Sequence, residues 1–385
     1  MARRSSSRPL IERLWQTPLP PQYLPIWAAL VPASLIYGAA LELRSRWWQA
    51  MAGRAEVPVI SAGNLTAGGN GKTPFTLFLA NRLRGRGFNA GIASRGWGRR
   101  ASREAAAMVS DGERILLGVH QAGDEPLMMA KAFGGPIAVG RRRADAIALL
   151  AAHALSRGRP LDVVILDDGF QHLRLKRDLN LLLVNGSRGF GNRWLLPAGP
   201  MRDRLAAAAR ADAVVIIDGG EGQPANPSSD LASALGLDDW RELERHPLFH
   251  ANLEPRALIS SASDCDDREG DRWTEHPLAL AGRRVVAVSG LADPAGFHAM
   301  LHRLGAQVIA TMPFRDHHAY GPSDVENILD AARNAELVVT TEKDLVKLER
   351  FPRTSLPLYA LRVEAVMALA EEARLLDLAT AVIRH

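Results

Sequence analysis

The feature that most constrains this chain is a glycine-rich stretch at residues 66–74, Thr-Ala-Gly-Gly-Asn-Gly-Lys-Thr-Pro. It follows the apolar segment Val57–Gly63, which predicts a strand, and precedes Thr73–Arg84, whose apolar residues have helical spacing. A strand that runs through such a loop into a helix is typical of a P-loop, in which backbone N–H groups and the helix N-terminus bind phosphate oxygens. The strict GxxxxGK[ST] pattern fails only at its first position, where Thr66 stands. We therefore predict a variant P-loop.

The loop also predicts which residues hold a nucleotide. Lys72 is expected to reach the β- and γ-phosphates of ATP, and the Thr73 hydroxyl is expected to ligate Mg²⁺. The other positions that would surround the phosphates are Gly68, Gly69, Asn70 and Gly71. Only five of the 47 basic residues are lysines, and one of them stands in this loop.

A second motif predicts the metal side of the same site. The apolar segment Val163–Leu166 reads as a buried strand and is followed directly by Asp167 and Asp168. In P-loop proteins a strand beside the loop's own strand ends in an aspartate that holds Mg²⁺. The two motifs together predict ATP and Mg²⁺ as cofactors, and the pattern leaves open which aspartate is the direct ligand.

Strands and helices alternate along most of the chain. In residues 55–220 the further predicted strands are Ala90–Ser94, Pro136–Gly140, Leu179–Val184 and Ala213–Ile217, and the further helices are Asp124–Phe133 and Ala144–Leu155. After residue 282 the predicted strands are Val285–Val288, Val308–Met312 and Leu337–Thr340, and the helices are Pro294–Leu304 and Ser323–Ala335. Apolar strands between amphipathic helices indicate a parallel sheet covered on both faces. We predict an α/β fold with a P-loop NTPase-like domain at 55–220, a linker and polar insertion at 221–282, and a smaller α/β domain at 283–385.

The composition argues against two other classes of protein. The single cysteine, Cys265, excludes a disulfide framework and a cysteine-based zinc cluster, and it fits a reducing compartment. Residues 1–54 hold seven arginines and two acids, a balance of +5 that equals the formal net charge of the whole chain. A nucleic-acid-binding protein more often carries its excess charge on the folded domain, so we expect no nucleic-acid partner.

The first 54 residues predict a membrane anchor. Tyr23–Leu41 is apolar, and its 19 residues would span about 28 Å as a helix. The segment starts too late and is too long for a signal peptide, while Pro25 and Pro32 are expected to interrupt a spanning helix. Aromatic residues and flanking arginines favour an anchor at the membrane surface. A helix packed on the domain remains the alternative.

A longer motif points to one family. Asp167 and Asp168 continue into Gly-Phe-Gln-His, and DDGFQH after an apolar strand is more specific than the aspartate pair alone. The chain resembles the tetraacyldisaccharide 4′-kinases, the lipid A 4′-kinases of Gram-negative envelopes. The other motifs that carry this resemblance are AGGNGKTP at 67–74, SRGWGR at 94–99, GDEP at 123–126, LPAGPMR at 196–202, FRDHHAY at 314–320 and TTEKD at 340–344.

The chain departs from the family's pattern at three places. The family usually has Thr where Asn70 stands, commonly Tyr at Trp97, and usually Leu-Arg-Glu where this chain has Met-Arg-Asp at 201–203. Asn70 keeps a small polar side chain and Asp203 keeps a carboxylate. The departures therefore bear on rate and fine specificity more than on the reaction.

The resemblance implies a reaction and a place for it. The family transfers the γ-phosphoryl group of ATP, with Mg²⁺, to the 4′-hydroxyl of a tetraacylated glucosamine disaccharide 1-phosphate, a late step of lipid A biosynthesis. The expected partners are this membrane lipid and an anionic membrane surface, with no obligatory protein partner evident. The expected location is the cytoplasmic face of the bacterial inner membrane, through a peripheral, monotopic or single N-terminal helix.

The resemblance also implies catalytic roles. Asp124 is expected to act as the base, helped by a hydrogen bond from His317, although Gly-Asp-Glu-Pro is also a typical helix start with Asp as its N-cap. With His317 in that role, the smaller domain must close over the first, with a hinge near residues 218–255. A divalent-metal site at Asp316-His317-His318 is disfavoured, since Mg²⁺ prefers oxygen ligands.

Other polar residues have weaker expected roles. Arg202 is a candidate for stabilising the transferred charge, and Glu125, Gln171 and Arg95 are second-rank site residues. The arginines expected to meet the substrate's anomeric phosphate or anionic lipid are Arg95, Arg99 and the run Arg141-Arg142-Arg143. For the run alone, a solvated basic face is the favoured interpretation. Lys343 is expected to be structural within the smaller domain. The alternative functions are a membrane-tethered P-loop NTPase switch or metal-insertion factor, and a nucleotide-binding scaffold.

Overall fold

The computed structural model describes residues 10–15, 18–69, 71–99, 105–219, 246–260, 274–291, 294–351 and 357–384. The structural statements below concern these residues. Asn70, Cys265 and most of the predicted linker and insertion at 221–282 lie outside them.

One mixed sheet runs through the part of the chain that the structure describes. Its strand order is β11-β10-β12-β13-β8-β7-β6-β1-β5-β2-β4-β3, with β9 paired to β8. The strands are β1 (Val59–Gly63), β2 (Ala90–Ser94), β3 (Ala107–Asp111), β4 (Pro136–Val139), β5 (Val163–Asp167), β6 (Leu179–Asn185), β7 (Ala213–Asp218), β8 (Leu248–Ser260), β9 (Thr274–Glu275), β10 (Arg284–Ser289), β11 (Gln307–Pro313), β12 (Leu337–Thr341) and β13 (Leu358–Val366). This order confirms the predicted α/β fold, and β3, β9 and the β8–β13 pair add antiparallel neighbours to a sheet predicted as parallel.

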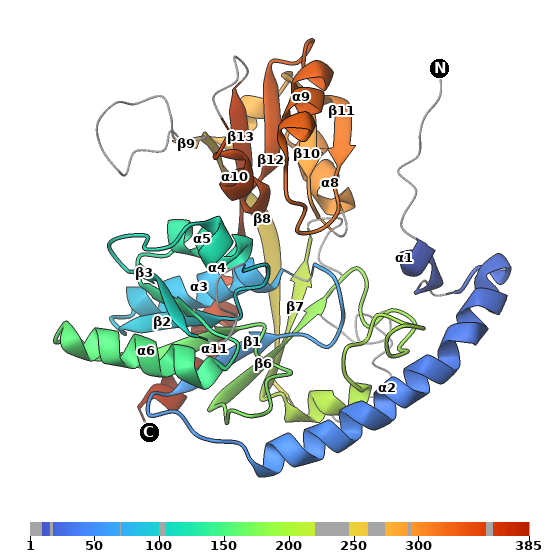
Figure 1. Ribbon diagram of the computed structural model, residues 1–385. Helices are drawn as coiled ribbons and strands as arrows, with labels where there is room; N and C mark the ends of the chain where they lie inside the picture. The colour runs from blue at the N-terminus through green and yellow to red at the C-terminus, as the bar shows by residue number, and fades with distance from the viewer. Residues whose placement is uncertain are drawn as a thin grey trace.

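Helices cover the sheet on both faces (Figure 1). They are α3 (Lys72–Gly85), α4 (Val119–Ala122), α5 (Asp124–Ala132), α6 (Arg143–Ser156), α8 (Ala295–Arg303), α9 (Pro322–Ala331), α10 (Glu342–Leu348) and α11 (Leu369–Ile383), with the short 3₁₀ segments η2 (Leu205–Arg210) and η4 (Pro277–Leu280). We call the half of the sheet from β7 to β3, with its helices, the first lobe, and the half from β13 to β11, with its helices, the second lobe. In the first lobe, α3, α5 and α11 pack on one face and α6 packs on the other. Strands covered on both faces bury every residue, which explains their continuous apolar runs.

The long strand β8 joins the two lobes (Figure 1). Its first residues, Leu248–Asn252, pair with β7 of the first lobe, and its later residues pair with β13 of the second lobe. The chain then returns, because α11 packs against α3 with ion pairs of 2.9 Å from Arg82 to Glu372 and 2.7 Å from Arg86 to Asp377. The domain boundaries stay a prediction, and α11 contributes to the core of the first lobe.

The N-terminal segment forms a long helix that extends along the outside of the molecule (Figure 1). After α1 (Leu10–Leu14) and η1 (Pro21–Tyr23), α2 runs without a break from Leu24 to Ala50. The expectation that Pro25 and Pro32 interrupt the helix is therefore wrong. Pro25 lies in the first turn, where its missing N–H has no helical partner, and Pro32 removes only one backbone hydrogen bond from 27 residues.

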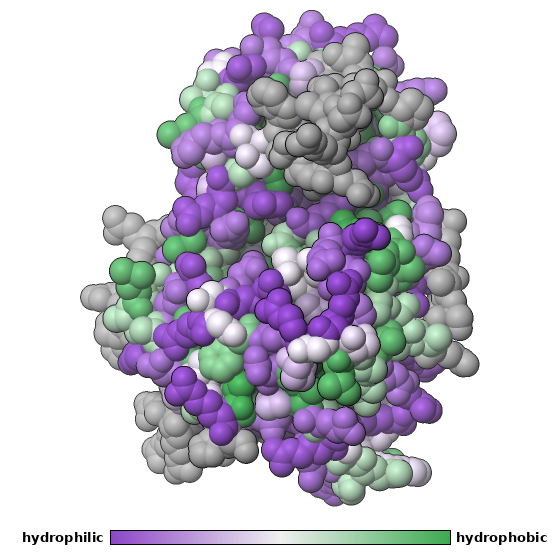
Figure 2. Space-filling view, turned by 90° about the vertical axis from the view of Figure 1, so that its left-hand side faces the viewer, coloured by the Kyte–Doolittle hydropathy of each residue, from purple (hydrophilic) through white to green (hydrophobic). Residues whose placement is uncertain are grey.

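Most of α2 is not covered by the rest of the protein. Segment 21–50 is long and apolar enough to cross a membrane, and only 17% of its most apolar window is buried. Ser34, Gly38 and Leu41 are its buried residues, whereas Leu35 and Ile36 are 62% and 72% exposed. The helix is thus not the packed core helix that the sequence left open. On the side that carries β3, α5 and α6, by contrast, hydrophilic residues predominate and hydrophobic ones form small separate patches (Figure 2).

Candidate active site

The glycine-rich loop joins β1 to α3 at the carboxyl edge of the sheet. Gly71 is the N-cap of α3 with a φ of 67°, and a Cβ on it would lie 2.7 Å from Cγ2 of Ile217. Only glycine meets both the left-handed backbone and this close approach. Lys72 begins α3, where its charge acts on both Asp167 and Asp168 at the end of the neighbouring strand β5. The structure therefore brings the predicted lysine and the predicted aspartate pair together.

Asp167 is the last residue of β5 and is buried. The hydroxyl of Thr76 donates to its Oδ1 at 3.3 Å, and the hydroxyl of Ser94 donates to its Oδ2 at 3.2 Å. Burial, together with the carboxylates nearby, raises the pKa of Asp167 to about 7. Thr76 lies one helical turn after Thr73, so Asp167 faces the side of α3 that carries Thr73.

Asp168 is held by Arg202. Two guanidinium nitrogens donate to the two carboxylate oxygens at 2.9 and 3.0 Å, and one of these nitrogens also donates to Oδ1 of Asn64. Although burial raises the pKa of Asp168, the charges of Lys72 and Arg202 hold it well below its usual value. Gln171 donates to the backbone oxygen of Asn64, so Arg202 and Gln171 meet at the same point beside the loop.

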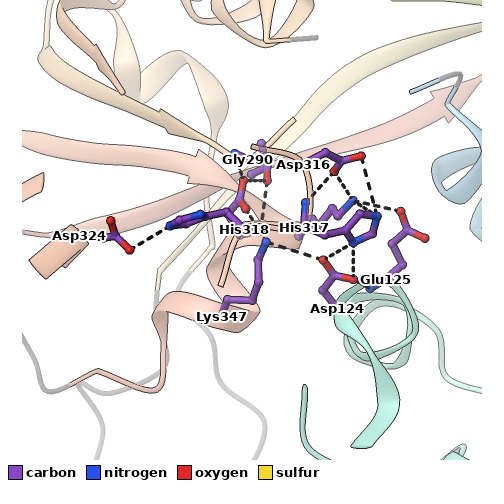
Figure 3. Close-up of polar contacts among 11 residues, drawn as sticks. Asp124, Glu125, Gly290, Asp316, His317, His318, Asp324 and Lys347 are labelled. Carbon is purple, nitrogen blue, oxygen red and sulfur yellow. Dashed lines mark hydrogen bonds and ion pairs between the residues drawn. The ribbon is translucent and has the colours of Figure 1, made fainter. Parts of the chain in front are cut away.

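Asp124 and His317 come from different lobes and meet between them (Figure 3). Nδ1 of His317 lies 3.0 and 3.2 Å from the two carboxylate oxygens of Asp124, which is 193 residues away in the chain and 6% exposed. Asp124 is the first residue of α5, and the helix cap is Gly123, where a Cβ would lie 2.5 Å from the backbone oxygen of Trp97. The alternative that Asp124 is the N-cap is therefore wrong.

The two members of this pair influence each other's protonation. Burial acts to raise the pKa of Asp124, but the hydrogen bond from His317 and the ammonium of Lys343 hold it below its usual value. Burial acts to lower the pKa of His317, but the hydrogen bond to Asp124 brings it above its usual value. Asp124 is thus favoured as a charged carboxylate at neutral pH.

Two of the polar site residues have an unusual backbone. Among the described non-glycine residues, φ is positive at Asp168 (52°), Arg193 (60°) and His317 (57°). A left-handed backbone costs energy for a residue with a Cβ, and such residues persist where the surrounding structure holds them. At His317 this backbone directs the ring towards Asp124 of the other lobe, and at Asp168 it directs the carboxylate towards Arg202 beside the P-loop.

Lys343 also reaches across the lobes, which corrects the expectation that it is structural within the smaller domain. Its Nζ lies 3.2 Å from Oε1 of Glu125 in the first lobe and 2.8 Å from Oδ1 of Asp316 in the second lobe. Nε2 of His317 lies 3.3 Å from the same nitrogen. The second-rank candidate Glu125 therefore takes part in the contact between the lobes.

A cavity of about 1400 Å³ opens between α2 and the carboxyl edge of the sheet. Its lining residues are Tyr37, Arg44, Trp47, Trp48, Met51, Arg95, Arg141, Arg142, Arg143, Ala144, Asp145, Asp168, Gln171, His172, Arg174 and Arg202. Asp124 and His317 do not line it, but Arg95 stacks on Trp97 at 5.3 Å, and the Trp97 ring lies 6.3 Å from that of His317. One aromatic side chain thus separates this arginine-rich cavity from the Asp124–His317 pair.

The predicted arginines divide into two groups. Arg95, Arg141 and Arg142 are exposed and line the cavity, as does the buried Arg143, whose pKa burial lowers to about 10. Arg99 does not line it, because its side chain is buried and donates to backbone oxygens at 2.9 and 3.3 Å. Its expected contact with phosphate or lipid is therefore wrong, and its role is to hold the loop after β2.

Helix α2 is hydrogen-bonded to the loop that carries Arg202. The hydroxyl of Ser34 donates to the backbone oxygen of Leu195 at 2.9 Å, and the hydroxyl of Tyr37 donates to the backbone oxygen of Arg202 at 3.1 Å. The amide of Arg202 in turn donates to the oxygen of Leu65 at 2.7 Å, at the start of the P-loop segment. Two short steps therefore connect α2 to the nucleotide loop.

Sequence reasoning missed several residues of this region. The side chain of Asn64 accepts a hydrogen bond from Arg202, and the hydroxyls of Thr76 and Ser94 donate to Asp167. These three residues lie in or beside the sequence motifs, but nothing in the pattern indicated a role for their side chains. His172 closes the DDGFQH motif and lines the cavity, where burial and the surrounding arginines lower its pKa to about 4. Its place in that motif was the available signal.

A sheet with a P-loop at its carboxyl edge and two aspartates at the end of the neighbouring strand defines a P-loop nucleotide-binding protein, here with a second lobe over the site and an apolar helix beside it. The family model of tetraacyldisaccharide-1-P 4'-kinases matches residues 26–381. The chain therefore belongs to this family of lipid A biosynthesis kinases, and a P-loop switch, a metal-insertion factor or a scaffold without chemistry is not favoured.

Relatives match over most of the chain. A tetraacyldisaccharide 4'-kinase of Anaeromyxobacter dehalogenans is 41% identical over 329 residues, which cover 84% of this chain and 81% of the relative. One of Desulfatibacillum aliphaticivorans is 37% identical over 345 residues, 87% of this chain and 88% of the relative. The crystal structure of LpxK from Aquifex aeolicus in complex with ATP has a TM-score of 0.69 at 30% identity and covers 93% of this chain and 99% of that one.

Proposed function

We propose that this protein transfers the γ-phosphoryl group of ATP to the 4′-hydroxyl of a tetraacylated glucosamine disaccharide 1-phosphate. The observation that carries the proposal is the position of the arginine-rich cavity, which lies between the aspartate beside the P-loop and the exposed apolar helix α2. An acceptor with acyl chains in a membrane and an anionic head group has the chemistry that this cavity complements. The named relatives support the same reaction.

The P-loop is the proposed ATP site. Lys72 and the loop at Gly68, Gly69, Asn70 and Gly71 would hold the phosphates, and the related LpxK was solved with ATP. Thr73 with Asp167 or Asp168 would hold Mg²⁺, which usually takes one or two carboxylates and the substrate's phosphates as ligands. The residues fit this ion, because Asp167 and Asp168 are adjacent carboxylates and, even with Lys72 nearby, burial and the neighbouring carboxylates raise the pKa of Asp167 to about 7, an excess of negative charge that a divalent cation would offset. An Mg²⁺ ion held by these residues would neutralise charge that develops on the phosphate oxygens.

Asp124 is the proposed base. As the 4′-oxygen attacks the γ-phosphorus, its proton passes to the Asp124 carboxylate, the bond from the γ-phosphorus to the bridging oxygen breaks, and ADP leaves. The N–H of His317 orients the carboxylate and keeps its charge available. Arg202, already positioned beside the nucleotide loop by Asp168 and Asn64, is suited to stabilise charge on the transferred group.

The cavity is the proposed binding site for the acceptor's head group. Arg141 and Arg142 are exposed there and offer donors to the 1-phosphate, while Trp47 and Trp48 present aromatic surface at the end of α2. The helix itself, with exposed Leu35 and Ile36, is suited to lie in or across the bilayer. We place the protein accordingly at the cytoplasmic face of the bacterial inner membrane.

A transfer assay tests the proposed reaction. The full chain in detergent or vesicles is given γ-labelled ATP, Mg²⁺ and a tetraacylated glucosamine disaccharide 1-phosphate, with Lys72→Met as the control that loses the phosphate-binding ammonium. We expect labelled lipid with the unaltered chain and at least a hundredfold less with Lys72→Met. Label that stays on ATP, or appears only as inorganic phosphate, would overturn the proposal.

A further inference from the structure

We propose that Lys343 is a positioning residue that fixes the proton of His317 on Nδ1, facing Asp124. The inference rests on the proposed function of the Asp124–His317 pair, and it goes beyond it by assigning a role to a side chain from a third element, α10. It also gives Glu125 a role, as a partner of this lysine in the first lobe.

The contacts of Lys343 account for all of its donors. Nζ lies 2.8 Å from Oδ1 of Asp316, 3.2 Å from Oε1 of Glu125 and 3.3 Å from Nε2 of His317. An ammonium group has three N–H donors and no acceptor. Burial acts to lower the pKa of Lys343, but the carboxylates around it keep it above its usual value, so the group stays charged and remains a donor only.

A donor at Nε2 determines the form of the imidazole ring. Because Lys343 can only donate, Nε2 of His317 must accept, and an accepting ring nitrogen carries no proton. The proton of the neutral ring then lies on Nδ1, which faces both carboxylate oxygens of Asp124 at 3.0 and 3.2 Å. A hydrogen bond made by one ring nitrogen commonly sets the state of the other in this way.

The charged groups around the ring favour the same arrangement. Asp124 of α5 and Asp316 of the ring's own loop face the ring, and so does Lys343 of α10. Glu125 contacts Lys343, and Lys347 contacts Asp124, so both act on the ring through these neighbours. Lys347 is already paired, with its Nζ 2.9 Å from Oδ1 of Asp344 and 3.7 Å from Oδ2 of Asp124 (Figure 3). Lys343 is therefore the cation that contacts the ring itself.

This arrangement assigns the proton taken from the acceptor. His317 gives Asp124 a neutral N–H donor, and protonation at Nε2 would put two donors face to face at the position of Lys343. The substrate's proton therefore passes first to Asp124 and not directly to the ring. Without Lys343, the ring proton can move to Nε2, and Nδ1 then presents a lone pair to a carboxylate that it no longer stabilises.

Lys343→Met tests this role, with Lys131→Met as the matched control. Lys131 of α5 also pairs across the lobes, with Glu349 at the C-cap of α10, but it lies seven residues beyond Asp124, about 10 Å along the helix. We expect Lys343→Met to lower kcat about 30-fold, to leave the KM for ATP within about twofold, and to move the acid limb of kcat to higher pH. The direction follows because the ammonium lowers the pKa of Asp124, so its loss raises it. Lys131→Met should keep the wild-type profile.

Nitrogen NMR of ¹⁵N-histidine-labelled protein reads the tautomer without any turnover. The His317 signals are assigned by their loss in His317→Asn. At a pH above the pKa of His317, where the ring is neutral, we expect a protonated Nδ1 and an unprotonated Nε2, changing to a mixture in Lys343→Met. If Lys343→Met does not fold, Lys343→Gln serves, since it keeps the length and loses the charge.

Three outcomes would overturn the proposal. The first is a wild-type pH profile and wild-type His317 signals in Lys343→Met. The second is an equal loss of kcat in Lys343→Met and Lys131→Met with no change of tautomer, which would make the lysine a clamp between lobes. The third is a proton on Nε2 of the neutral ring in the unaltered protein. Failure of the proposed function is distinguishable, because the unaltered protein would then form no labelled lipid, whatever the tautomer of His317.

Discussion

The junction of α5 with α10 and the cavity beside α2 use positive charge in opposite ways. At the junction each lysine has a carboxylate partner: Lys343 has Asp316 and Glu125, and Lys347 has Asp344. Along the cavity, no carboxylate among the described residues pairs with the exposed Arg95, Arg141 and Arg142. Paired charges fix the positions of protons, whereas unpaired arginines are available to an anionic ligand.

The two regions are close enough to act on one substrate. Arg95 belongs to the cavity and stacks on Trp97, whose ring lies 6.3 Å from that of His317. We expect the two regions to serve different functions. Variants at the junction should alter turnover, and variants at the cavity and α2 should alter binding of the lipid.

The largest effect is expected from Asp124→Ala. Loss of the proposed base should lower kcat about 10³-fold while ATP binding stays within about twofold, because the P-loop is untouched. Turnover is measured by lipid phosphorylation and ATP affinity by calorimetry. Asp124→Asn is the isosteric control and should be as inactive, since an amide cannot take the proton. Near-normal turnover in either variant would leave the pair a structural contact.

A smaller effect, on binding alone, is expected from Arg141→Gln combined with Arg142→Gln. Each arginine is expected to contribute about 1 kcal/mol to binding an anionic head group, so the KM for the lipid acceptor should rise about 30-fold with kcat nearly unchanged. Arg333→Gln, at an exposed position just after α9, is the control for loss of an arginine charge away from the cavity. A fall in kcat without a change in KM would break the division between the two regions.

The smallest effect is expected from Leu35→Asn combined with Ile36→Asn on α2. These side chains are exposed, so folding should be unaffected, and partial loss of their transfer free energy should weaken binding to anionic vesicles about tenfold. Binding is measured by vesicle sedimentation. Leu369→Asn on α11 is the control, because Leu369 is 85% exposed on a helix that belongs to the first lobe. Equal losses in both proteins would remove α2 from the membrane contact.

Much of the fold could be predicted from the sequence because its buried strands are continuous apolar runs. The strands Ala90–Ser94 and Val163–Leu166 and the loop between Val57–Gly63 and α3 were predicted within a few residues of their observed bounds. By contrast, β8, β13 and α11 were missed. β8 alternates between buried and exposed residues and contains Pro255, so it lacks the continuous run that marks a central strand.

The candidate site was predictable only where its parts are adjacent in the chain. The P-loop and the aspartate pair are each contiguous, and their strands are neighbours in the sheet. The contact of Asp124 with His317 joins residues 193 positions apart, and it was expected from the family resemblance alone. The roles of Lys343 and Arg99 depend on where their side chains point, which no spacing in the sequence specifies.

The measurement that tests the central claim most directly is the position of the phosphate on the product. After the transfer reaction, the lipid is isolated and its phosphate esters are assigned by phosphorus NMR coupled to the sugar protons. We predict one new phosphate monoester per ADP formed, on the 4′-oxygen of the disaccharide. ADP formed without lipid phosphate, or phosphate on a different oxygen, would contradict the account.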